Sequence, residues 1–221
     1  TRYWAFYSDN TNCGVRSSTD GTTWSSLTNI RACGSAIKFS VGNSGSTLLY
    51  CFADGSAQNF KFGTYTLNSD GTLTAVITET SITTTGTAGD VPACTIATDS
   101  DLWVAVNTQQ AGVYHAEIWT CATTCGTTSN WSKSRDITID PSAGPTQGIL
   151  LTLTVGKVAY IYNEVATDSS GALLITEFDT SWSTDVTTTS NYELTASGAT
   201  TIGDTIHFAG RKTTGGTDVR Y

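Results

Sequence analysis

The sequence predicts an all-β protein built as a β-propeller. Short apolar runs recur along the 221 residues at intervals of about 50 residues, the period expected of propeller blades. Threonine, valine, isoleucine and aromatic residues are abundant, and no long helical stripe of apolar residues occurs, so the composition also favours strands. The five runs are Tyr3–Tyr7, Leu48–Phe52, Leu102–Val106, Val158–Tyr162 and Thr205–Ala209.

Each apolar run is expected to be the second strand of a four-stranded antiparallel unit, and about five such units form one domain. In the third unit the pattern predicts strands at 93–98, 102–107, 113–120 and 131–138. Turn sequences such as Asp70-Gly71 separate the strands. The predicted units span residues 1–32, 33–88, 89–142, 143–192 and 193–221.

The two terminal units are incomplete within the chain. The sequence opens directly on a second strand and closes on a third strand. Two interpretations remain open: the chain is a piece of a longer propeller, or its end strands pair with another copy, since unpaired edge strands template association. The first residue is Thr1 and no signal peptide is present, so we expect a processed or excised chain.

Net charge and hydropathy exclude several partners. The formal net charge is −8, and no lysine or arginine cluster is present that could neutralise a row of phosphates. We therefore expect no nucleic-acid partner. No apolar run approaches the roughly 18 residues that a membrane-spanning helix needs, so we expect no membrane insertion.

Six cysteines indicate an oxidising, extracellular setting and a set of disulfides. Zinc is the competing interpretation, because Cys121 and Cys125 have a plausible ligand spacing, but no second Cys/His pair follows them. Six cysteines allow 15 connectivities. The position of each cysteine in the repeat leads us to predict the pairs Cys13–Cys33, Cys51–Cys94 and Cys121–Cys125.

The segment Ser18-Thr19-Asp20-Gly21-Thr22-Thr23-Trp24 resembles the Asp-box of sialidase-like propellers. In such a turn the Asp20 carboxylate accepts backbone N–H groups, Gly21 permits a positive φ, and Trp24 is expected to plug between strands. Two weaker copies follow, at Trp131-Ser132 and Trp182-Ser183. The resemblance implies a fold rather than an activity, because Asp-boxes lie opposite the catalytic face in that family.

A catalytic site of the sialidase type would require an arginine cluster, a Tyr/Glu nucleophile pair and an Asp acid. The arginines here do not recur at matching places in successive units. Glycosidase chemistry in general needs two carboxylates that flank one bond, and Asp9, Asp54 or Glu164 could supply them only with a positioned partner. We therefore expect no enzyme, no cofactor and no metal site. A glycoside hydrolase fragment remains the alternative.

Polar residues follow the second strands, where propeller topology places a rim around the central channel. Together with a tyrosine they would suit hydroxyl-rich ligands such as glycans through hydrogen bonds and ring stacking. Asn130 also opens a glycosylation sequon, Asn130-Trp131-Ser132. The candidate rim residues are Asp9, Asp54, Asn107, Tyr162, Asn163, Glu164 and Arg211.

Together these features predict a secreted, disulfide-stabilised propeller without catalysis. The first hypothesis is a cell-surface structural or adhesive component that self-assembles through its end strands. A glycan-binding module that uses the rim is the alternative, and a fragment of a sialidase-like hydrolase is a further one.

Overall fold

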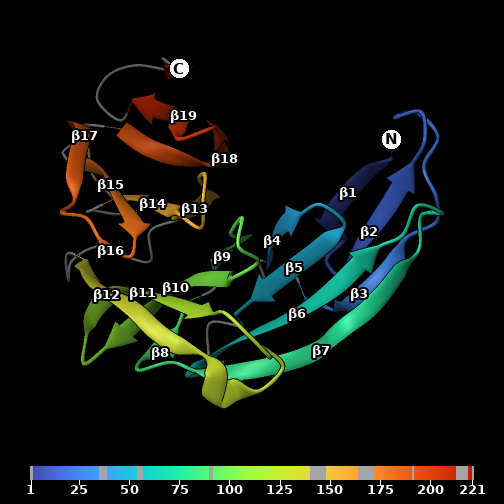
Figure 1. The fold of residues 1–221 in the computed structure, drawn as a ribbon, viewed down its shortest axis with the longest axis horizontal. Helices are drawn as coiled ribbons and strands as arrows, with labels where there is room; N and C mark the ends of the chain where they lie inside the picture. Colours follow the sequence, from blue (N-terminus) through green and yellow to red (C-terminus); the bar gives the residue numbers. More distant parts are fainter. Residues whose placement is uncertain are drawn as a thin grey trace.

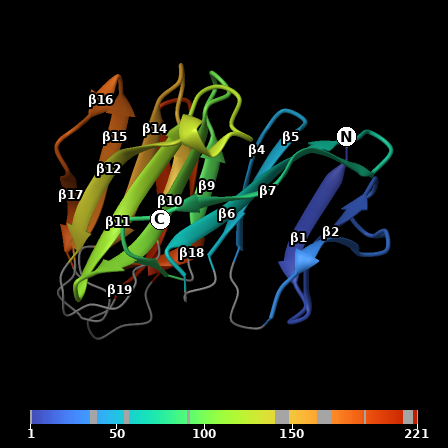
Figure 2. The ribbon, with the colours of Figure 1, turned by 90° about the horizontal axis from the view of Figure 1, so that it is seen from below.

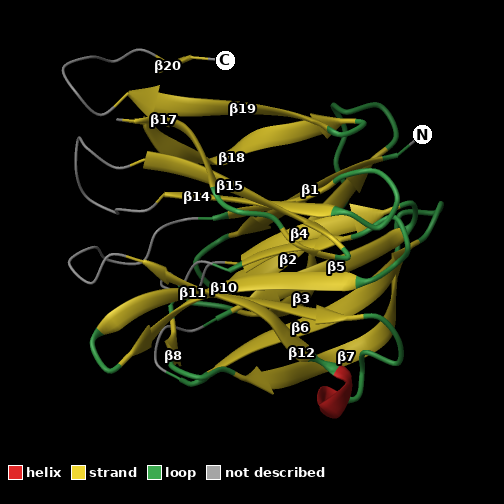
Figure 3. Cartoon of the chain, turned by 60° about the vertical axis from the view of Figure 1, so that its left-hand side comes forward, coloured by secondary structure: helices red, strands yellow, loops and turns green. Residues whose placement is uncertain are grey.

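The computed structural model describes residues 2–34, 39–53, 57–89, 92–139, 148–163, 172–190, 192–212 and 219–220. Within them almost every element is a strand, and the one helix is the 3₁₀ turn η1 (Thr128–Asn130), drawn red in Figure 3. The all-β prediction is therefore confirmed. No helix in these ranges is long and apolar enough to cross a membrane.

The first two sheets are simple antiparallel meanders, in which each strand pairs with the next one along the chain. In the second sheet, Gly45 and Gly71 adopt positive φ at the turns after the first and third strands, which glycine does without steric cost. The strands of the first sheet are β1 (Tyr3–Ser8), β2 (Asn12–Ser18) and β3 (Thr28–Ala32). Those of the second are β4 (Phe39–Ser44), β5 (Thr47–Phe52), β6 (Asn59–Leu67) and β7 (Leu73–Thr83).

The third and fourth sheets each contain five strands rather than the predicted four. In the third sheet two short strands both pair with β10, and in the fourth the predicted last strand is divided in two. The third sheet consists of β8 (Thr87–Ala88), β9 (Ala93–Ile96), β10 (Leu102–Gln110), β11 (Val113–Cys121) and β12 (Ser132–Ile139). The fourth consists of β13 (Ile149–Thr152), β14 (Val158–Asn163), β15 (Ala172–Asp179), β16 (Ser181–Trp182) and β17 (Val186–Ser190).

The last sheet again has three strands, which agrees with the prediction of incomplete terminal units. The five sheets follow one another around an open arc (Figures 1 and 2). Among the described residues no strand of the first sheet pairs with a strand of the last, so the sheets do not close into a ring. The last sheet consists of β18 (Tyr192–Ile202), β19 (Thr205–Lys212) and β20 (Val219–Arg220).

The core lies between consecutive sheets, because side chains alternate along each central strand and serve two interfaces. β10 illustrates the pattern. Val104 belongs to an apolar cluster with Leu49 of the second sheet. Its neighbour Trp103 belongs to a separate cluster with Tyr160 of the fourth sheet. A third cluster joins the fourth sheet to the fifth. The third and fourth sheets are therefore covered on both faces by apolar side chains.

The first sheet lacks the innermost strand that the other sheets have. Strands β4, β9, β13 and β18 each precede the central strand of their sheet and contact one another in turn. β1 aligns with the central strands, and no described strand pairs with its other side. β1 is therefore an edge strand, with one row of backbone N–H and C=O groups unpaired by a described strand.

Candidate functional site

The Asp-box turn between β2 and β3 has the hydrogen bonds that its sequence predicts. Asp20 Oδ1 accepts the N–H groups of Thr23 and Thr22 at 2.7 and 2.8 Å and the Ser18 hydroxyl at 2.9 Å. These bonds hold the pKa of Asp20 well below its usual range, and those from the Thr23 and Thr22 N–H groups contribute most. Gly21 has a φ of +77°. The carboxylate is thus used to fold the turn.

Trp24 departs from the prediction, because it is 37% exposed rather than plugged between strands. The two related tryptophans are packed against the preceding sheet. The ring centroid of Trp131, a residue only 6% exposed, lies 4.6 Å from that of Phe62 in the second sheet. The Trp182 ring lies 5.9 Å from that of Trp103 in the third sheet. No described sheet precedes the first one, so Trp24 has no such partner.

The structure buries two of the predicted rim residues. Asn107 is 2% exposed and Tyr162 is 3% exposed, so the prediction of a solvent-facing rim is wrong at both positions. Tyr162 is buried because it lies, like Tyr160, on the face of β14 that packs against the third sheet. Asp54 and Glu164 lie outside the described residues, as do the side chains of Asn163 and Arg211.

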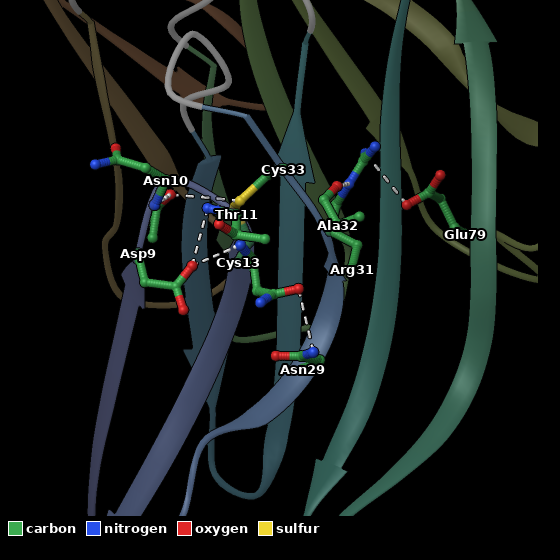
Figure 4. The surroundings of a disulfide bond; sticks show 11 residues. Asp9, Asn10, Thr11, Cys13, Asn29, Arg31, Ala32, Cys33 and Glu79 are labelled. Carbon is green, nitrogen blue, oxygen red and sulfur yellow. Dashed lines mark hydrogen bonds and ion pairs between the residues drawn. A yellow bond between two sulfur atoms is a disulfide. The ribbon is translucent and has the colours of Figure 1, made fainter.

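Asp9 lies in the turn between β1 and β2, next to the Cys13–Cys33 disulfide (Figure 4). Its Oδ1 accepts the N–H groups of Asn12 at 2.7 Å and Thr11 at 2.9 Å, and these two bonds lower its pKa. The side chain is exposed, but the bonds occupy one carboxylate oxygen in fixing the turn. Asp9 therefore has a local structural role in this geometry.

An ion pair between the third and fourth sheets was missed by the sequence analysis. Arg135 Nη2 lies 2.6 Å from Asp185 Oδ1, and Arg135 also donates to the Ser183 carbonyl oxygen and to the Thr176 hydroxyl. Burial raises the pKa of Tyr162, and the negative charge of nearby Asp185 adds to the shift. The Asp185 carboxylate thus pairs with a guanidinium and lies near a phenol at the interface between the two sheets.

A similar ion pair joins the first two sheets. Arg31 of β3 lies 3.3 Å from Glu79 of β7, and its guanidinium carbon lies 3.3 Å from the Phe52 ring centroid (Figure 4). In both cases an arginine from the last strand of one sheet meets a carboxylate of the next sheet near an aromatic ring; for Arg135 the ring is that of Trp182, whose centroid lies 5.3 Å from the guanidinium carbon. The signal in the sequence was an arginine in the fourth strand of units one and three. These two arginines are neutralised locally, so neither is available as a free anion-binding group.

The third sheet contains a fully buried carboxylate that the sequence analysis also missed. Glu117 accepts hydrogen bonds from the Thr85 N–H, the Thr108 hydroxyl, the Gln110 amide and the Trp119 indole. Because these donors satisfy it, the group is a structural anchor. It holds Thr85, which lies just before β8, to β11 of the same sheet.

Two of the three predicted disulfides are present. Cys13–Cys33 ties the middle strand of the first sheet to the residue that follows β3, and Cys121–Cys125 closes a loop after β11. The structure differs from the third prediction: Cys51 and Cys94 are buried, free thiols. Each of the bonded pairs lies within one sheet, whereas these two cysteines come from different sheets, and their separation is set by how those sheets pack.

Asn130, the predicted glycosylation residue, is exposed in η1. Its amide nitrogen donates to the carbonyl oxygens of Thr123 and Thr124, both at 3.2 Å. The side chain therefore braces the loop that the Cys121–Cys125 disulfide closes. Glycosylation of this sequon stays a prediction.

The outer face of the first sheet is the candidate functional surface. Its opposite face meets the second sheet, where Arg2 and Ser17 bond to the carbonyl groups of Ser69 and Gly71. Ser17 is paired with Trp4, so the alternating residues Tyr3, Ala5 and Tyr7 lie on the outer face.

We call the set Tyr3, Tyr7 and Arg16 the Tyr3 face. The Tyr3 side chain is 50% exposed, and the Arg16 guanidinium carbon lies 6.0 Å from the Tyr7 ring centroid. The Asp-box turn adjoins this face, since Gly21 lies beside the Tyr3 ring. The turn adds the exposed Trp24. Exposed aromatic groups gathered on one sheet face are typical of interaction surfaces.

Comparison with known proteins finds likeness in structure only. No protein-family model and no curated protein matches the sequence. A mutant of the NanB sialidase from Streptococcus pneumoniae aligns with 91% of this chain and 32% of its own, with a TM-score of 0.52 at 15% identity. The sialidase of Trypanosoma rangeli, solved with the inhibitor DANA, aligns with 85% of this chain and 36% of its own, with a TM-score of 0.48 at 15% identity.

A hypothetical protein from Leishmania major aligns with 95% of this chain and 75% of its own, with a TM-score of 0.44 at 8% identity. The likeness to NanB, together with the Asp-box turn, gives the chain a sialidase-like β-propeller fold. At 15% identity the likeness concerns the fold alone. The chain spans about a third of the length of the two sialidases.

Proposed function

We propose that the chain is a non-catalytic, extracellular β-propeller module that serves as a structural or adhesive component of a cell surface. In this proposal it associates with further copies of itself through its first sheet. The observation that carries the proposal is the uncovered state of that sheet. Trp24 and Tyr3 are exposed, whereas Trp131, from a related position, is buried against a neighbouring sheet.

The free edge of β1 supports the same proposal. An edge strand presents a row of hydrogen-bonding groups that another strand can complete, and the Tyr3 face supplies apolar area next to it. A strand from another copy would add main-chain hydrogen bonds, and the exposed aromatic rings would add packing contacts. Both contributions come from one end of the molecule.

The absence of catalysis is supported by how the charged groups are used. Arg31 and Arg135 are each paired with a carboxylate between sheets, and Asp9 and Asp20 fold their own turns. None of these four has the freedom that a catalytic acid, base or anion ligand needs. Extracellular placement is supported by the two disulfides, which persist in oxidising compartments.

Sedimentation velocity over a range of concentrations tests the proposal. The 221-residue chain is expected to associate as concentration rises, and the double variant Tyr3→Ser/Trp24→Ser to remain monomeric at the same concentrations. Val155→Ser is the matched control, because Val155 is also an exposed apolar residue but lies in a turn of the fourth sheet. A wild type that stays monomeric throughout, or a control that weakens association equally, overturns the proposal.

A sialidase-like hydrolase is the second candidate, and the fold likeness to NanB is the observation that favours it. Hydrolysis of a fluorogenic sialoside by the purified chain would establish it and remove the claim of no catalysis. The buried positions of Asn107 and Tyr162 weaken the remaining alternative, glycan binding at the rim. Glycan-array binding that survives Tyr3→Ser/Trp24→Ser would revive a lectin function elsewhere on the molecule.

A further inference from the structure

Two buried cysteines face each other across the interface between the second and third sheets. Cys51 lies in β5 and is 0% exposed, and Cys94 lies in β9 and is 5% exposed. Both belong to the same apolar cluster, together with residues such as Leu49 and Val104. Neither thiol is open to solvent in the folded chain.

Hydrogen bonds place the Cys94 sulfur directly over β4 and β5. Its Sγ donates to the Ser40 carbonyl oxygen at 3.4 Å and to that of Leu49 at 3.8 Å. Ser40 is the residue paired with Cys51 across these two strands. Leu49 precedes Cys51 by two positions and so shares its face of β5. Cys94 is near enough to Cys51 to contribute to the raised pKa of its thiol.

The backbones of the two sheets approach closely at this point. A Cβ atom on Gly42 of β4 would lie 2.7 Å from the Thr95 Cα and 2.8 Å from the Cys94 carbonyl oxygen. Only glycine fits such an approach, and the contact fixes how far β9 stands from the second sheet. The position of the Cys94 sulfur relative to Cys51 is therefore set by backbone packing rather than by a mobile side chain.

We propose that Cys51 and Cys94 form a third disulfide, which joins the second sheet to the third when the chain meets a disulfide-bearing oxidant. One cysteine thiolate attacks a sulfur of the oxidant and expels a thiolate, and the second cysteine then attacks the mixed disulfide. The new bond joins the two Sγ atoms. The electron pair reduces the oxidant to two thiols, which take up the two protons that the cysteines lose.

This bond would differ from the other two disulfides in what it restrains. Cys13–Cys33 and Cys121–Cys125 each act within one sheet, with sequence separations of 20 and 4. A Cys51–Cys94 bond would close a longer loop and lock two consecutive sheets together. Chain-entropy reasoning gives a rise in melting temperature on the order of 10 °C for a loop of that length in a domain of this size.

Burial also determines when the bond can form. It raises the pKa of the Cys51 thiol, with the neighbouring Cys94 adding to the shift, so little thiolate is present in the folded protein. An oxidant cannot reach either sulfur while the sheets are packed. The bond is therefore expected to form during folding, and to form slowly once a reduced chain has folded.

Thiol counting tests the proposal on the full chain. The protein is unfolded, reduced, refolded with a mixture of reduced and oxidised glutathione, then unfolded in guanidinium with N-ethylmaleimide and analysed by mass spectrometry without reduction. The expected result is no alkylated cysteine and a cross-linked peptide that contains Cys51 and Cys94. Alkylation of both residues, or their appearance in other pairs, overturns the proposal.

A second measurement covers the case in which refolding fails. Native protein secreted from an oxidising compartment is counted in the same way, and Cys51→Ala is expected to leave exactly one alkylated residue, Cys94. The double variant Cys51→Ala/Cys94→Ala should melt below the oxidised wild type by roughly the stated amount. Cys121→Ala/Cys125→Ala is the matched control and should retain the Cys51–Cys94 cross-link. Two alkylated residues in the secreted wild type contradict the proposal.

Discussion

The first and fourth sheets carry the same Trp-Ser pair in the same backbone setting, yet the tryptophans differ in environment. Ser25 N–H donates to the Ser17 carbonyl oxygen, and Ser183 N–H donates to that of Glu177. Each serine hydroxyl in turn accepts the N–H of the same partner, Ser17 or Glu177, at 3.0 Å. The local hydrogen bonds are thus equivalent in the two sheets.

The two tryptophan side chains, however, meet different surroundings. Trp182 packs between Phe178 and Trp103, and its indole N–H donates to the Ser134 hydroxyl of the preceding sheet. Trp24 is exposed in the connection between β2 and β3. The comparison teaches that a short motif fixes its own turn, whereas burial of its aromatic group depends on a neighbouring sheet that the motif does not encode.

The largest loss of stability is expected when a tryptophan covered by a neighbouring sheet is replaced. Trp131→Ala removes a buried ring that packs on Phe62 and Phe60, and the cavity should lower the free energy of unfolding by about 3–5 kcal/mol. Trp24→Ala should cost less than about 1 kcal/mol, because much of that ring already meets solvent. Urea denaturation followed by circular dichroism measures both. Equal losses would refute the comparison.

The Cys13–Cys33 disulfide should matter next, since within the described residues only one face of the first sheet packs against another sheet. Replacing both cysteines by alanine should cost about 3 kcal/mol, against about 2 kcal/mol for Cys121→Ala/Cys125→Ala with its shorter loop. Hydrogen exchange should accelerate in residues 3–32 in the first variant only. Exchange that accelerates evenly over all the sheets would show that the first sheet is not a separately weak unit.

The inter-sheet arginine provides a third test. Arg135→Ala leaves the carboxylate of Asp185 without its partner and should lower the free energy of unfolding by about 2 kcal/mol. Arg16→Ala, on the uncovered face, should change it by no more than about 0.5 kcal/mol. The same denaturation experiment measures both changes. If Arg16→Ala proves the more damaging, the Tyr3 face is not free in solution.

Removal of the Asp-box carboxylate should change the stability least, and the change should be visible mainly in how the melting temperature depends on pH. The pKa of Asp20 is lowered in the folded state, so its contribution is present above the unfolded value of about 3.9 and is lost as the pH falls through the lower folded value. Asp20→Asn should therefore melt below the wild type at pH 7. The gap should narrow as the pH drops below about 4, and a gap independent of pH would count against this role.

Local features were predictable from the sequence because they rest on contacts within a few residues. The Asp-box hydrogen bonds and the Cys121–Cys125 pair are of this kind. The period of the apolar runs also predicted the order of the sheets, since strand pairing here joins neighbours along the chain. β8 was missed because a two-residue strand has no period to detect.

The exposure of the candidate rim residues could not be predicted, because a position after a strand does not say whether the side chain faces solvent or the next sheet. Tyr162 shares a face with Tyr160 and is covered by the third sheet. Asn107 is likewise buried. The Arg135–Asp185 pair joins residues 50 positions apart, and no local pattern brings them together.

The sequence alone determined the all-β class, the repeated unit, the Asp-box turn and two disulfides, because periodicity and short-range hydrogen bonding suffice for them. Only the tertiary structure decided which aromatic rings are covered, which arginines are neutralised and which sheet has a face and an edge that no described strand covers. Those properties depend on the packing of one sheet against another. Packing is set by the sum of many distant contacts, which no single segment of the chain contains.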